Sequence, residues 1–202
     1  MIVKGNIEII EGTMCNVYVF KLNDKIIQVD AGMKGSAKKI IDYYQKRNLR
    51  PDVVLITHYH IDHIGSLGII KEKYNPEIYA NKLEIPVIEG KSSMGRPKSL
   101  GARLMFSFMK PEKVSGIKPL EDLKIEGLKI LETPGHTPGS TSFIVEKENS
   151  VFIGDAASSV NGTLQINEKY TMNMEKAKES LNKIRSLSPI LVLPGHGEPL
   201  QI

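Results

Sequence analysis

The sequence predicts an α/β fold in which strands and helices pack in layers. Two observations carry this prediction. Short apolar runs of the kind that form strands alternate along the chain with longer segments that have a helical apolar stripe. Several of the apolar runs have a histidine or aspartate just past their ends, and in layered α/β folds ligands bind where strand ends open into loops.

The length and composition are those of one globular domain over residues 1–202. Hydrophobic residues make up 41% of the chain and charged residues 25%, and no apolar run reaches the ~18 residues of a membrane span. The N-terminus lacks the apolar core of a signal peptide, so we expect a cytoplasmic protein. Abundant lysine and isoleucine are typical of thermophilic proteins. Cys15 is the sole cysteine; it excludes an internal disulfide and is expected to be buried and inert.

The first half of the chain predicts a small antiparallel sheet followed by alternating helices and strands. Alternating apolar residues separated by turn residues predict two or three antiparallel strands, over 7–10, 16–20 and 25–30. The elements expected next are a helix over about 37–47 with Ser36 as its N-cap, a buried strand over 53–56, a helix over 64–73 and a strand over 76–80.

The second half repeats this plan. Glu126-Gly127 predicts a hairpin turn between strands over 123–125 and 128–131. The other elements expected here are strands over 141–145 and 150–153, a helix over 174–187 and a last strand over 190–193.

Two further segments are expected to shape a pocket. Residues 158–171, with a hairpin turn at Asn161-Gly162, follow one candidate ligand directly and should border the site. Residues 88–118 form an insertion between the halves, with basic residues around an apolar run. This insertion is interpreted either as a basic, apolar lid or as a linker packed on the core or on a second subunit.

All five histidines of the chain fall where a two-metal site would need them. Three lie in the run 58–63 together with an aspartate, and each of the other two closes a Pro-Gly-His tripeptide. Imidazole and carboxylate are the ligands that zinc and neighbouring transition metals use in proteins. The candidate ligands are His58, His60, Asp62, His63, His136, Asp155 and His196.

Their spacing suggests how two ions would be shared. Alternate residues of a loop can point the same way, so His58 and His60 can bind one ion, while Asp62 and His63 bind a second. His136 and His196 would add one imidazole to each ion, and Asp155 could bridge both. A helix N-cap is the alternative role for Asp155. Zinc is the favoured metal, with iron or manganese as alternatives.

The pattern closely resembles the metallo-β-lactamase superfamily over nearly the whole chain. The family's HxHxDH motif stands here as His58, His60, Asp62 and His63. The family's third-loop histidine, bridging aspartate, last histidine and early strand-end aspartate match His136, Asp155, His196 and Asp30. The resemblance implies a four-layer αββα sandwich. It also implies one ion on His58, His60 and His136 and the other on Asp62, His63 and His196.

The resemblance further implies a hydrolase in which a metal-bound hydroxide attacks an acyl carbon. Asp62 would bind metal and also orient the hydroxide, which makes it the candidate catalytic residue. Asp30 is expected to act as a turn or supporting residue rather than as a ligand. A non-catalytic metal-binding protein and a single-iron oxygenase acting on sulfur compounds are the alternatives from other classes.

The closest resemblance in size and layout is to single-domain glyoxalase II-like hydrolases, which favours a thioester or ester substrate. Two segments depart from those enzymes, Ile64-Gly65-Ser66 and 156–159, and their glutathione-binding helical domain is missing. Lactonase and phosphodiesterase activities are therefore kept as alternatives. The absence of a tyrosine between Asp155 and Tyr170 weighs against a lactonase.

The expected partner is a small molecule. The net charge of +4 weakly favours an anionic acyl substrate. No block of basic residues points to nucleic acid, and no segment points to a membrane. A homo-oligomer is left open.

Overall fold

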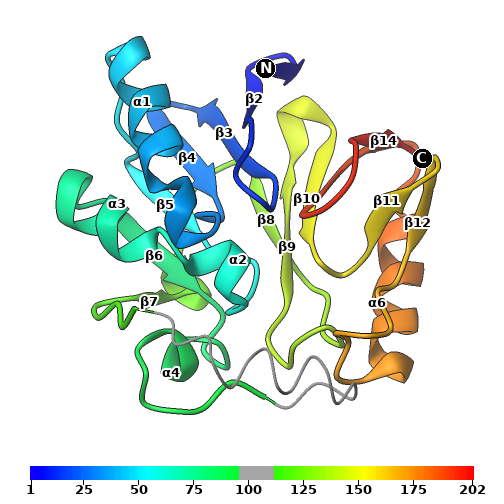
Figure 1. The fold of residues 1–202 in the computed structure, drawn as a ribbon. Helices are drawn as coiled ribbons and strands as arrows, with labels where there is room; N and C mark the ends of the chain where they lie inside the picture. The colour runs from blue at the N-terminus through cyan, green and yellow to red at the C-terminus, as the bar shows by residue number, and fades with distance from the viewer. Residues whose placement is uncertain (96–111) are drawn as a thin grey trace.

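The computed structural model of the protein describes residues 1–95 and 112–202, which fold into four layers, helix–sheet–sheet–helix (Figure 1). Two mainly separate sheets face one another, and each has helices on its outer side. The predicted αββα sandwich is thereby confirmed. No helix in the described ranges has the length and apolar character needed to cross a bilayer.

The first sheet has its strands in sequence order. They are β1 (Ile2–Lys4), β2 (Ile7–Ile10), β3 (Val17–Leu22), β4 (Lys25–Val29), β5 (Val53–Leu55), β6 (Glu77–Ala80) and β7 (Lys118–Pro119). The pairs from β1 to β4 are antiparallel, and those from β4 to β7 are parallel. The parallel connections run through helices, as such connections require.

The second sheet is mixed. Its order is β14 (Leu200–Gln201), β13 (Leu191–Pro194), β10 (Ser150–Gly154), β9 (Thr141–Val145) and β8 (Leu128–Glu132). Only β10 and β13 run parallel. A separate hairpin of β11 (Ser158–Val160) and β12 (Thr163–Gln165) turns at Asn161-Gly162, as predicted.

The helices of the described ranges are α1 (Ala37–Arg47), α2 (Ile61–Ile64), α3 (Leu67–Tyr74), α4 (Ile85–Ile88) and α6 (Met174–Arg185). Short 3₁₀ turns cover Lys34–Ser36, Leu120–Asp122 and Glu146–Glu148. Helices α1 and α3 pack on the first sheet, and α6 packs on the outer face of the second (Figure 1).

The alternation of side chains along the strands divides the core into layers. In β5, Val53 and Leu55 face the space between the sheets, whereas Val54 faces the helices. In β10, the ring of Phe152 faces the first sheet and stacks on the ring of Phe20, with 5.0 Å between the ring centroids. Val151 points to the other side of the strand and faces α6. Strands buried on both faces are the reason that these runs are continuously apolar.

The predicted hairpin over 123–131 is wrong. Residues 123–126 form no strand, because the backbone turns through the 3₁₀ segment before Leu123 and again at Leu128. Leu123 and Ile125 instead pack against the core between the sheets from a loop. Strand β8 pairs with β9.

The predicted helix over 64–73 is found as α3, which begins at Leu67, while Ile64 is the last residue of the separate helix α2. A β-carbon on Gly65 would meet the backbone nitrogen of Lys34 at 2.5 Å, so the chain packs tightly against the 3₁₀ turn at this point. Ser36 precedes α1 as expected, but its hydroxyl donates to the carbonyl of Thr13 instead of capping the helix.

The insertion at 88–118 is only partly described. Val114 and Ile117 are buried in the part of the core that the first sheet shares with its covering helices. The basic and apolar run within 96–111, on which the lid interpretation depends, lies outside the described residues.

Candidate metal centre

The candidate ligands come from the ends of four strands. His58 follows β5, His60 precedes α2, and Asp62 and His63 lie within that short helix. The others follow the second sheet's strands: His136 after β8, Asp155 after β10 and His196 after β13. The fold brings all seven together, which is the convergence at strand ends that the sequence predicts.

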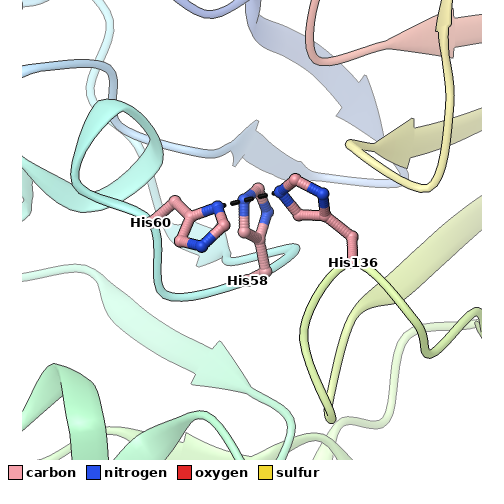
Figure 2. A group of neighbouring side chains, drawn as sticks. All are labelled: His58, His60 and His136. Carbon is pink, nitrogen blue, oxygen red and sulfur yellow. Dashed lines mark hydrogen bonds between the residues drawn. The ribbon is translucent and has the colours of Figure 1, made fainter. Parts of the chain in front are cut away.

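Three histidines form one group. The nitrogens that His58, His60 and His136 offer lie within 4.8 Å of one another, and all three side chains are buried. Figure 2 shows their rings pointing toward one another from the loops after β5 and β8. Nε2 of His136 lies 2.8 Å from Nδ1 of His60. This arrangement is suited to one tetrahedral ion with three imidazole ligands.

A second group lies on the other side of the site. Asp62, His63 and His196 also offer ligand atoms within 4.8 Å of one another. Nε2 of His196 lies 3.1 Å and Nε2 of His63 lies 3.8 Å from Oδ2 of Asp62. The two groups are the two ligand sets that the resemblance implies.

Asp155 lies between the groups. Its Oδ1 is 3.3 Å from Nε2 of His63, and its Oδ2 is 3.4 Å from Nε2 of His136 and 3.6 Å from Nε2 of His196. One oxygen therefore faces His63, and the other faces His136 and His196. The alternative role as a helix cap is wrong, because a turn and then β11 follow Asp155.

Buried polar atoms test whether metal fits the site. Within the described ranges, four buried side-chain atoms lack any hydrogen-bond partner, and all four belong to candidate ligands: Nε2 of His58, Nε2 of His63, Nδ1 of His136 and Oδ1 of Asp155. An unsatisfied buried polar group costs roughly 1–3 kcal/mol, so such atoms do not gather by chance. Nitrogen and carboxylate donors of this kind fit divalent transition metals.

Asp30 and Thr57 orient two of the histidines, His63 and His58, through contacts with their Nδ1 atoms. Oδ2 of Asp30 accepts a hydrogen bond from Nδ1 of His63 at 2.7 Å, which directs Nε2 of that ring into the site. The backbone and hydroxyl of Thr57 both donate to the same carboxylate, and the hydroxyl lies 3.0 Å from Nδ1 of His58. Asp30 thus lies behind the ligands, and Thr57 is a supporting residue that the sequence did not reveal.

At His60 and Asp62, burial and the local charges favour the protonation states that bind metal. Burial and the neighbouring His136 lower the pKa of His60 to about 3, so its ring is neutral at pH 7. Burial alone would raise the pKa of Asp62, but the charge of His63 and the hydrogen bond from His196 lower it to about 2. Neutral imidazole and ionised carboxylate are the forms that bind metal.

A cavity of about 330 Å³ opens beside the ligands. Its other walls are apolar at Met14, Met33 and Ile61, and polar at Ser158, Asn167 and Tyr170. The segment 158–171 therefore borders the site, as predicted. Tyr170 reaches the cavity although it lies well beyond Asp155 in sequence, so its sequence distance is a poor argument against a role in binding.

Sequence reasoning missed two side chains that hold the ligand loops. Asn16 donates to the carbonyls of Pro194 and Gly197, on either side of His196. Glu84 is completely buried and accepts hydrogen bonds from the loops of His58 and His136. Glu84 follows strand β6, so the strand-end pattern that identified the ligands also applies to it.

Comparison with known proteins gives consistent matches. A family model described as the metallo-beta-lactamase superfamily matches residues 10–196. The chain is 30% identical over 216 residues to the probable metallo-hydrolase YflN of Bacillus subtilis (strain 168), covering 93% of this chain and 82% of that protein.

Two further relatives bear on the chemistry. A hydroxyacylglutathione hydrolase of Bdellovibrio bacteriovorus is 28% identical over 85% of this chain, which spans 59% of that enzyme. The crystal structure of TTHA1623 in a di-iron-bound form superposes with a TM-score of 0.75 at 25% identity, covering 99% of this chain and 94% of that one. Of the three, one is a probable metallo-hydrolase by name, one is a hydroxyacylglutathione hydrolase by name, and one contains two iron ions.

Proposed function

The chain belongs to the metallo-beta-lactamase superfamily, and from this membership we propose that it is a hydrolase with two divalent metal ions that cleaves a thioester or ester of a small acyl substrate. The observation that carries the proposal is the convergence of five histidines and two aspartates at one site, where three of the histidines and both aspartates line the cavity. A full ligand set beside an open cavity is the arrangement of a catalytic rather than a structural metal site.

The residues have separate tasks in this proposal. His58, His60 and His136 would hold one ion, and Asp62, His63 and His196 the other, with Asp155 between them. When bound, such a pair of ions lowers the pKa of a water and stabilises charge on an acyl oxygen. Zinc is the proposed metal, with iron or manganese as alternatives, because imidazole and carboxylate accept all three.

Asp62 is the proposed catalytic residue. Its carboxylate is partly exposed, lies within the cavity wall and stays ionised, so it can accept a hydrogen bond from an attacking water. Its Oδ2 lies 3.1 Å from Nε2 of His196, so the two side chains can face the same ion. Asp30, which is buried behind His63, has no access to a substrate and serves orientation alone.

An acyl substrate fits the walls of the cavity. Met14, Met33 and Ile61 offer apolar contact for an acyl chain, and Ser158 and Asn167 offer hydrogen bonds. The hydroxyacylglutathione hydrolase among the relatives supports a thioester, although the altered segment 156–159 argues against glutathione itself as the thiol.

Lactone cleavage is the second candidate. It requires the same attack on an acyl carbon with an alkoxide as the leaving group. The phenol of Tyr170 in the cavity wall favours it, since a hydroxyl at this place can hydrogen-bond a ring ester.

A screen of hydrolase substrates tests the proposal. Protein reconstituted with zinc is assayed on acyl thioesters, esters, lactones, β-lactams and phosphodiesters, with chelated protein and His58→Ala as controls. We expect thioesters to be cleaved fastest and both controls to fall to the uncatalysed rate, because the ion held by His58 is lost. Turnover of phosphodiesters without any cleavage of thioesters or esters would contradict the proposal.

A further inference from the structure

Glu84 is a buried carboxylate outside the ligand sets. It lies between β6 and α4, and none of its surface is exposed to solvent. Its partners in the described ranges are neutral N–H and O–H donors rather than cations. Burying a carboxylate in this way is costly, so its retention calls for a reason other than stability.

Each oxygen of Glu84 serves a different ligand loop. Oε2 accepts from the backbone nitrogen of Tyr59 at 2.8 Å, and Tyr59 lies between His58 and His60. Oε1 accepts from the hydroxyl of Thr137 at 2.9 Å and from the backbone nitrogen of Gly139 at 2.7 Å, directly after His136. One side chain therefore joins the two loops that carry the three-histidine group.

The contact with the second loop is a close one. A β-carbon on Gly139 would lie 2.7 Å from Oε1 and 2.9 Å from Cγ of Glu84, so glycine is needed there. Burial raises the pKa of Glu84 to about 7, although the three donors favour the ionised form. Glutamine would avoid the charge, but its amide group would face a backbone N–H on one loop or the other.

We propose that Glu84 is a positioning residue that sets the spacing between the loops of His58–His60 and His136, and thereby the affinity of the three-histidine group for its metal ion. The inference rests on the proposed function in that it takes these histidines as ligands. Among the described residues, Glu84 makes no hydrogen bond or ion pair with Asp62, His63 or His196, so the affinity for the second ion should be much less affected.

Zinc affinity in two backgrounds separates the ions. His196→Ala leaves the three-histidine group intact, and His58→Ala leaves the Asp62–His63–His196 group. Adding Glu84→Gln should weaken zinc binding about 10- to 100-fold in the first background, the usual effect of losing a residue that orients a ligand. In the second background the affinity should change by no more than about twofold.

Val145→Ala is the matched control, because it removes buried volume at the end of β9 that is distant from both loops. It should lower thermal stability and leave the zinc affinity unchanged in both backgrounds. Glu84→Asp, which keeps the charge but shortens the reach, should fall between the parent and Glu84→Gln.

Two results would overturn the inference. One is unchanged zinc affinity of Glu84→Gln in the His196→Ala background. The other is equal weakening in both backgrounds, which would indicate general destabilisation. Binding is measured without a substrate, so an enzyme that binds zinc normally but cleaves no acyl substrate would defeat the proposed function and leave this inference standing.

Discussion

Asp155 is the residue on which both metal groups depend. Its oxygens lie 3.3–3.6 Å from ring nitrogens of His63, His136 and His196, which belong to different groups. Its loss should therefore affect both ions, whereas loss of a single histidine should affect mainly one.

Asp155→Ala should abolish hydrolysis and reduce the binding of both ions. Residues that merely orient a ligand contribute 10- to 100-fold, so removing a shared ligand should cost at least about 100-fold in kcat/KM. Metal content and kcat/KM are measured beside Asp42→Ala, an exposed aspartate of α1 that pairs with Lys38. Normal zinc content in Asp155→Ala would show that the carboxylate does not bind metal.

The candidate ligands could be read from the sequence, whereas the residues that hold them could not. The ligands form short motifs, and their residue types alone indicate metal chemistry. Glu84 acts through hydrogen bonds with residues 25 and 55 positions away in the sequence, and Thr57 acts through a carboxylate 27 positions away. Such contacts form only in the folded chain. Glutamate after a strand is also a common surface residue, so its type gave no signal.

At the scale of elements, strand ends place the ligands and helices fix the loops between them. Helix α6 shows this for His136. The carbonyl of Gly135 accepts hydrogen bonds from Met172 and Asn173, and Asn173 caps α6 through the backbone nitrogen of Lys176. The start of the helix is therefore tied to the loop that carries the histidine.

Gly135→Ala should separate this loop from α6. Gly135 has a positive φ of 135°, and a β-carbon there would lie 2.3 Å from the backbone nitrogen of Ala177. We expect the free energy of unfolding to fall by roughly 2–4 kcal/mol, from strain and overpacking, and hydrolysis to fall with it. Thermal or denaturant unfolding and kcat/KM are the measurements.

Gly162→Ala is the control for this variant. Gly162 also has a positive φ, of 72°, but nothing lies within 4 Å of the β-carbon position. The substitution should cost only ~1 kcal/mol through backbone strain and leave hydrolysis intact. Equal effects of the two alanine variants would show that the contact with α6 does not support the site.

The strands that pack on both faces were predictable, and the segments shaped by turns were not. The runs at β5, β9, β10 and β13 are apolar because both of their faces are buried, which is a local property of the sequence. The segment 123–131 alternates apolar and charged residues as a strand exposed on one face would, but its first part packs from a loop. The periodicity of apolar residues reflects which side chains are buried, and it does not distinguish a paired strand from a loop that packs on the core.

At the scale of the whole molecule, the site joins the two halves of the sandwich. The first sheet supplies His58, His60, Asp62 and His63, and the second supplies His136, Asp155 and His196. Each metal group takes ligands from both sheets. Metal ions that bind only the folded chain therefore add their binding free energy to the stability of the packing between the sheets.

The number of metal ions per chain tests the central claim most directly. The protein is purified without chelator, reconstituted with zinc or manganese, freed of unbound metal and submitted to elemental analysis. Seven convergent ligands with a shared carboxylate predict a value that approaches two ions per chain. A value that stays near one after reconstitution with either metal would contradict the two-metal account.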